Sequence, residues 1–277
     1  MLKQNNYLNS EQSFRVIPAS EGSFYTLGEF YSPIVRFGRE YDDDQFNLLR
    51  ILWPAVCLER FGSEKGKNCL ADGSGWDPQS LFAIIDNLGQ RFGLRRLFGN
   101  PDILVCDDLG TEAADFILAD TDKRRVVFIH AKGTGEGVAR RYAASPLQEI
   151  CGQATKNLKY LSRYGDDEPP KARNWHTQKW AGAKGVSGKV DNRIRLKPRS
   201  ITTGWQLWKA IKSIIRDHFA DLEVWLFLGR MFSKSSFDQQ LNADRPATEA
   251  QQSAYLIFST MNDAASVGAK LRVVCSP

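Results

Sequence analysis

The sequence predicts one mixed α/β domain in which a central β-sheet is flanked by helices. Three short β-type segments lie at 103–106, 114–120 and 125–132, and the breaks between them have good turn composition. An amphipathic helix follows from Ser145-Pro146, with its apolar residues on one face. Since helices and strands continue to alternate beyond it, one layered domain is favoured over two independent folds.

Elements outside this core are predicted from the same periodicities. Residues 46–61 are apolar and predict a helix that Pro54 kinks or breaks. A Gly- and Ser-rich loop follows, and Pro78 opens a helix over about 79–92. We therefore expect a helical or irregular N-terminal extension over 1–78 and an α/β domain over 79–277. The later part of that domain is predicted as a helix at 203–219, a strand at 222–228, a helix at 248–266 and a strand at 271–275.

The composition is that of a globular protein. The chain has 277 residues, of which 42% are apolar and 25% are charged. It has no run of about 18 apolar residues that could cross a membrane and no apolar signal segment at its start. Five cysteines without a C-x-x-C pair suggest reduced thiols, so we expect a cytoplasmic protein without membrane contact and without a structural zinc site.

Positive charge is concentrated in one segment, 171–199. It contains nine Lys or Arg residues against a single acid, Asp191, so it has a net charge of +8 while the rest of the chain, at +5 overall, is left with −3. Trp175 and Trp180 lie between these cations. The pattern predicts a long basic insertion that contacts a phosphate backbone through residues such as Arg193, Arg195, Lys197 and Arg199. The alternative is a solvated loop whose tryptophans pack into the core.

The polar residues of the segment 111–133 predict a site. A hairpin with Lys123 and Arg124 at its turn places Asp115 opposite Lys132, and His130 shares a face with Lys132. The glycine-rich segment 133–137 follows, then Arg140 and Arg141, which would add positive charge. The helix after them presents Gln148 and Glu149 away from its apolar face.

This combination of groups suits phosphodiester cleavage. A carboxylate can hold a divalent cation, and an ammonium group can bind a phosphate oxygen or the attacking water.

The pattern Asp115, fourteen intervening residues and then His130-Ala131-Lys132 resembles the PD-(D/E)xK, or restriction-endonuclease-like, nuclease superfamily. The resemblance covers about 79–164, with the core motif in 101–164, and includes the preceding helix, the three strands and the following helix. It implies that Asp115 binds the metal ion, Ala131 offers its backbone carbonyl to it, and Lys132 is the catalytic lysine. Gln148 resembles the helix glutamine of the exonuclease-like branch.

The sequence departs from this family at His130, where an acid is usual. His130 could itself be a ligand, or the missing acid could come from Glu149, Glu112, Glu136 or Asp86. Glu59 is a more distant candidate. Alternatively the site has degraded and the domain only binds DNA.

The resemblance implies a DNA nuclease that uses Mg²⁺ or Mn²⁺, such as the effector of a bacterial restriction or antiphage system. The implied partners are DNA and a helicase or sensor protein, with a homo-oligomer left open. The first alternative is a catalytically inactive nucleic-acid-binding or assembly subunit that keeps the fold. The second is a structural partner whose exposed aromatic residues form a protein interface.

Overall fold

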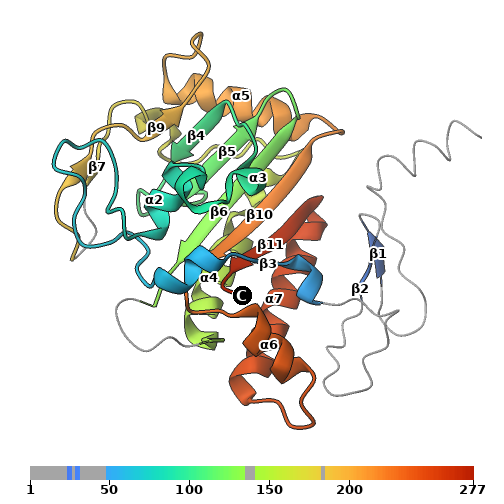
Figure 1. The fold of residues 1–277 in the computed structure, drawn as a ribbon. Coiled ribbons are helices and arrows are strands. Elements are labelled where there is room, and N and C mark those ends of the chain that lie inside the picture. The colour runs from blue at the N-terminus through green and yellow to red at the C-terminus, as the bar shows by residue number, and fades with distance from the viewer. Residues whose placement is uncertain (1–23, 27–28, 32–47, 135–140, 182–184) are drawn as a thin grey trace, which may run out of the picture.

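A seven-stranded mixed sheet organises the computed structural model, which describes residues 24–26, 29–31, 48–134, 141–181 and 185–277 (Figure 1). The strand order is β3-β11-β10-β6-β5-β4-β9. Strands β6, β5, β4 and β9 pair antiparallel, whereas β6, β10, β11 and β3 run parallel. The predicted α/β class with a mixed central sheet flanked by helices is therefore confirmed.

The strands of this sheet are β3 (Leu52–Pro54), β4 (Ile103–Cys106), β5 (Phe116–Asp120), β6 (Arg125–Lys132), β9 (Ile194–Leu196), β10 (Asp221–Leu228) and β11 (Ala269–Cys275). Two further pairs are β1 (Phe24–Thr26) with β2 (Glu29–Tyr31) and β7 (Trp180–Ala181) with β8 (Lys189–Val190).

The α-helices are α2 (Leu81–Asp86), α3 (Arg95–Phe98), α4 (Ala144–Asn157), α5 (Gly204–Arg216), α6 (Lys234–Leu241) and α7 (Thr248–Ser266). Short 3₁₀ helices are η1 (Leu48–Ile51), η2 (Val56–Arg60), η3 (Gln90–Phe92), η4 (Leu158–Leu161) and η5 (Ala172–Asn174). Helix α5 begins at a capping box, in which Thr203 and Gln206 each accept a backbone N–H of the other.

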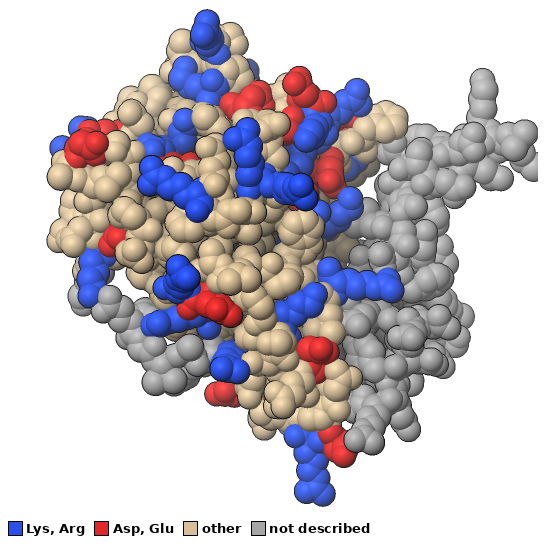
Figure 2. All heavy atoms as spheres, in the orientation of Figure 1, with Lys and Arg blue, Asp and Glu red and all other residues tan. Residues whose placement is uncertain are grey.

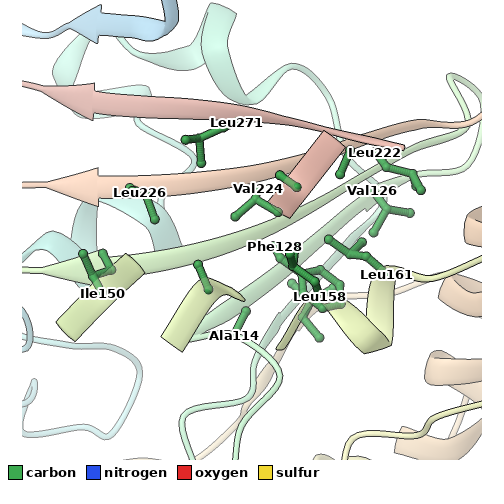
Figure 3. Packing of buried hydrophobic residues seen from close by; sticks show 14 of the residues in the cluster. Ala114, Val126, Phe128, Ile150, Leu158, Leu161, Leu222, Val224, Leu226 and Leu271 are labelled. Atoms are coloured by element: carbon green, nitrogen blue, oxygen red, sulfur yellow. The ribbon is translucent and has the colours of Figure 1, made fainter. Parts of the chain in front are cut away.

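The two faces of the sheet are covered by different helices. On one face, α4, α5 and α7 pack their apolar sides against residues such as Phe128 and Val224 (Figure 3). On the other face, α2 and α3 cover residues such as Phe116 and Ile129. Alternating residues of the central strands enter the two cores, as the period of a β-strand requires.

The N-terminal boundary at residue 78 is wrong for the described part of the chain. Residues 52–54 form edge strand β3 and pair with β11, so this segment belongs to the main sheet. The predicted helix over 46–61 is likewise replaced by η1, β3 and η2. Pro54 is tolerated because an edge strand does not need every N–H, and the N–H of Ala55 donates to Cys275 instead.

Helix α2 is shorter than the predicted 79–92. Ser80 caps its first turn by accepting the N–H of Ala83. The helix stops because Leu88 and Gly89 both adopt a positive φ, at 49° and 62°. Among the described helices, none has both the length and the apolar character that a membrane crossing needs.

Candidate active site

The β5–β6 hairpin has a register two residues away from the predicted one. Asp120 pairs with Arg125, so the turn contains residues 121–124 instead of Lys123 and Arg124 alone. The Asp120 carboxylate accepts the N–H of Lys123, and Arg124 takes a left-handed conformation with a φ of 51°. These local contacts favour the longer turn, and the same register continued brings Asp115 opposite His130 rather than Lys132.

Asp115 lies immediately before the first residue of β5, beside the part of β6 that extends past this pairing. Its Oδ2 accepts the N–H of Ala131 at 2.7 Å, so the carboxylate replaces the missing main chain of β5. The residue is only 7% exposed. Burial raises the pKa of the Asp115 carboxyl well above its usual value, and repulsion from Glu64 and Asp108 raises it further. The structure therefore joins Asp115 to the Ala131 N–H, and the resemblance assigns the metal ion to the carboxylate of the first residue and the carbonyl of the second.

Two charged residues that the sequence did not single out, Glu64 and Lys65, complete this region. The N–H groups of Leu81 and Phe82 donate to the carbonyls of Ser63 and Glu64, which holds the segment against the start of α2. On the other side, Gly133 approaches so closely that a Cβ there would lie 2.2 Å from the Gly62 carbonyl oxygen. Glycine is required at this contact because any side chain would separate the two segments.

Lys65 is a second cation of the cluster, and its side chain is 16% exposed. Its Nζ lies 2.8 Å from Asp108 Oδ2 and 3.1 Å from Glu64 Oε1. Asp108 Oδ2 also accepts the indole N–H of Trp180 at 2.7 Å. Burial alone would lower the pKa of Lys65, but the attraction of Asp108 and Glu64 outweighs it and raises that pKa.

Lys132 ends β6 and pairs with an acid from α4. Its Nζ lies 2.7 Å from Glu149 Oε1 and 4.0 Å from Glu64 Oε2. The side chain of Lys132 is 19% exposed and that of Glu149 is 56% exposed, so the pair is partly open to solvent. The structure thus brings Glu149 to the predicted lysine, and the neighbouring Gln148 is exposed on the same helix.

His130 is buried within the sheet. It is 2% exposed and pairs with Leu226 of β10. Burial lowers the pKa of its imidazole to about 4, so the ring is neutral at physiological pH. Strand alternation puts it on the side that α4 covers, the same side as Lys132.

The donor chemistry of this cluster fits a hard divalent cation. Four carboxylates, those of Glu64, Asp108, Asp115 and Glu149, are balanced by only two ammonium groups, and carboxylate oxygens are the ligands that Mg²⁺ and Mn²⁺ prefer. Among the residues described, no three His, Cys, Asp or Glu side chains already form a group that could hold a metal ion. Cation binding would therefore require these carboxylates to converge.

The other candidate acids are engaged elsewhere or are not described. Asp86 forms a two-point ion pair with Arg195, at 2.5 and 2.9 Å. One carboxyl oxygen of Glu112, Oε2, is buried without a hydrogen-bond partner, and the residue lies near Asp107. Glu136 and Arg140 lie outside the described residues.

The segment 171–199 is less exposed than predicted. Trp175 and Trp180 are each 1% exposed, as the alternative interpretation expected. Arg193 is 3% exposed, and its guanidinium donates to four carbonyls, including those of Cys106 and Asp108, so its predicted role at an exposed nucleic-acid interface is wrong. Its role is to join the segment to the end of β4.

The remaining cations of the segment differ in their availability. Arg195 is held by Asp86, and the Lys197 ammonium donates to the Ile201 carbonyl. Arg199 is exposed. Figure 2 shows Lys and Arg side chains distributed over the face in view, with acids between them, rather than gathered in one continuous stripe.

In the comparisons with known proteins, no family model, no curated protein and no solved structure matched the chain.

Proposed function

We propose that the protein is a divalent-metal-dependent nuclease that hydrolyses phosphodiester bonds in DNA at the Asp115–Lys132 cluster. The observation on which the proposal depends is the hydrogen bond from the Ala131 N–H to Asp115, one residue before Lys132. Support also comes from the order of the elements, because α2 precedes the antiparallel strands β4, β5 and β6 and α4 follows them. This is the order that the resemblance to PD-(D/E)xK nucleases implies.

In this proposal Asp115 and Glu64 would hold the cation, with the Ala131 carbonyl as a further ligand. Glu64 takes the place of the acid that the family usually has at the position of His130. A bound divalent ion supplies Lewis-acid activation of water and neutralises phosphate charge. Removal of the mutual repulsion among Asp115, Glu64 and Asp108 would favour its binding.

Lys132 would bind a non-bridging phosphate oxygen and stabilise the charge that develops on it. Glu149 holds the ammonium group in place before substrate binds, at 2.7 Å. Lys65 has a different role, because Asp108 and Glu64 both pair with it. It would limit the repulsion among the carboxylates.

The second candidate is a nucleic-acid-binding subunit with a degraded site. A specific observation favours it: both lysines of the cluster are ion-paired with carboxylates, Lys65 with Asp108 and Lys132 with Glu149. His130, a buried histidine where the family usually has an acid, also favours a site that has lost its catalytic function. Under either candidate, a restriction or antiphage role and a helicase or sensor partner remain proposals from the resemblance, a cytoplasmic location remains a proposal from the cysteine content, and a homo-oligomer is left open.

A cleavage assay on linear and plasmid DNA with Mg²⁺ or Mn²⁺ separates the two candidates. We expect the full chain to cleave DNA, and we expect Lys132→Gln and Glu64→Gln each to reduce the rate by at least about 100-fold. Lys156→Gln is the matched control, since Lys156 is exposed on the same helix as Glu149. DNA binding without cleavage by the wild type under both metals would support the second candidate and reject the first.

A further inference from the structure

A second concave site lies on the edge of the sheet where the parallel strands end. It is a cavity of about 320 Å³ lined by Glu59, Arg141, Arg230, Ser233, Ser235, Ser276 and Pro277. Arg230 and Ser276 follow the ends of β10 and β11, and Glu59 lies in η2, just after β3. Carboxyl ends of parallel strands are where open α/β sheets form binding crevices.

The lining of this cavity suits a phosphate group. Among the described lining residues, Arg141 and Arg230 provide two guanidinium groups and Glu59 provides one carboxylate, while the hydroxyls of Ser233 and Ser235 donate to the Pro277 carbonyl. Guanidinium groups present planar pairs of donors that match phosphate oxygens. A volume near 300 Å³ is at the small end of ligand sites, which leaves room for a phosphate with its attached sugar.

The walls of the cavity are held by hydrogen bonds. The Ser233 backbone N–H donates to the carbonyl of Arg141 at 2.8 Å, and the Arg141 guanidinium donates to the Ser236 hydroxyl at 3.3 Å. Ser276 lies beside Ser233, and its hydroxyl donates to the Phe232 carbonyl at 2.7 Å. Because these contacts join the approach to α4 with the start of α6, the arginine and serine groups have fixed neighbours before any ligand binds.

The cavity is connected to the candidate active site by the main chain. The Gly229 N–H donates to the carbonyl of Lys132 at 3.2 Å, and the next N–H, that of Arg230, donates to Phe61 at 2.9 Å. Lys132 and Arg230 therefore lie on adjoining segments at the carboxyl ends of the parallel strands β6 and β10, and each has a positively charged side chain.

We infer that this cavity binds a phosphate group of the DNA strand that occupies the Asp115–Lys132 cluster. The inference rests on the proposed function for the source of the phosphate, whereas the anion-binding chemistry comes from the guanidinium groups of Arg141 and Arg230. A phosphate held here would place the strand along the edge of the sheet, beside Lys132.

The test is a DNA-binding measurement with the full chain in EDTA, so that no cleavage occurs. We expect the double variant Arg141→Gln/Arg230→Gln to bind a short fluorescent DNA at least about tenfold more weakly, because charge-assisted hydrogen bonds to phosphate are lost. The control is Arg91→Gln/Arg96→Gln, which removes the same charge from exposed positions, and it should change affinity less than about threefold. Equal losses in both double variants would overturn the inference.

A second variant guards against a folding defect in the first. Ser235 is exposed at the cavity, so Ser235→Glu should leave the fold intact while an added carboxylate repels phosphate. We expect weaker DNA binding and no change in thermal unfolding, and unchanged affinity would count against the site. Inorganic phosphate should compete with DNA for binding to the wild type. If phosphate binds the cavity but the variants leave DNA affinity unchanged, the inference is rejected.

The outcome is distinguishable from failure of the proposed function. Loss of DNA affinity in the cavity variants of a protein that never cleaves DNA would support the cavity and reject the nuclease. If the cavity variants cleave DNA with an unchanged KM, the nuclease is supported and the role of the cavity is rejected.

Discussion

His130 gives a prediction whose magnitude follows from its burial. The imidazole is 2% exposed, and burial lowers its pKa from an ordinary 6.5 to about 4. Between these two values the unfolded chain binds a proton that the folded protein does not. The stability contribution of His130 is therefore complete above pH 6.5 and is lost as pH falls toward 4.

The size of this loss is set by about 1.4 kcal/mol per pH unit for one proton. Between pH 7 and pH 5 the titration covers roughly 1.5 units of the window, so His130 should cost the wild type about 2 kcal/mol. The His130→Gln variant has no such proton and should lack this component. Asp107, whose burial raises its pKa to about 7, titrates in the opposite direction in both proteins and cancels in the difference.

The assay is urea unfolding of the wild type and of His130→Gln at pH 5, 6 and 7. The free energy of unfolding should fall with decreasing pH by about 2 kcal/mol more in the wild type than in the variant. Parallel pH profiles would refute the claim that a buried neutral imidazole occupies this position. They would also restore the possibility that His130 is exposed to solvent or charged within a cluster.

Two further predictions concern Asp115 and the basic segment. Asp115→Asn should abolish cleavage and yet raise the melting temperature at pH 7. The reason is that it removes a carboxyl whose pKa is raised by burial and by repulsion from neighbouring acids. A lower melting temperature in a thermal scan would show that the residue is only structural. Arg193→Gln should cost about 2 kcal/mol in chemical unfolding by leaving buried carbonyls without donors, whereas Arg199→Gln should change stability by less than about 0.5 kcal/mol, and equal effects would contradict the difference in their burial.

Local sequence pattern was sufficient for the central hairpin and the helix after it. Strands β4 and β6 have the predicted limits, 103–106 and 125–132, because their apolar runs are bounded by turn residues on both sides. The register was harder to predict, since it depends on how Asp120 and Arg124 shape the turn, and several turns suit the same composition.

The acid of the site could not be predicted because it comes from a distant segment. Glu64 and Lys65 lie in a sequence of loop composition, with no period and no motif. Glu64 comes within 4.0 Å of Lys132 because Gly133, which has no side chain, approaches the backbone of Gly62, about 70 positions away in the sequence. Nothing in the local sequence around Glu64 indicates that approach.

The basic segment illustrates the opposite error. Charge density alone predicted exposed arginines, but the guanidinium of Arg193 can satisfy several carbonyls at once and so serves as an internal crosslink. Similarly, Trp175 is buried because its indole N–H has an acceptor in Asp107 at 2.5 Å. The net charge of a segment therefore does not indicate which of its cations face solvent.

The exposure of the two ion pairs distinguishes the two lysines of the candidate site. Lys132 and Glu149 form a pair that is half open to solvent, and such pairs contribute roughly 0–1 kcal/mol. A phosphate oxygen can displace Glu149 at little cost, so this ion pair by itself does not decide between a nuclease and a degraded site. Lys65 and Asp108 are only 16% and 15% exposed, and Trp180 donates a further hydrogen bond to Asp108. Displacement there would leave two largely shielded charges unpaired, so under the proposed function Lys132 is the lysine expected to meet the substrate and Lys65 is expected to stay in its ion pair.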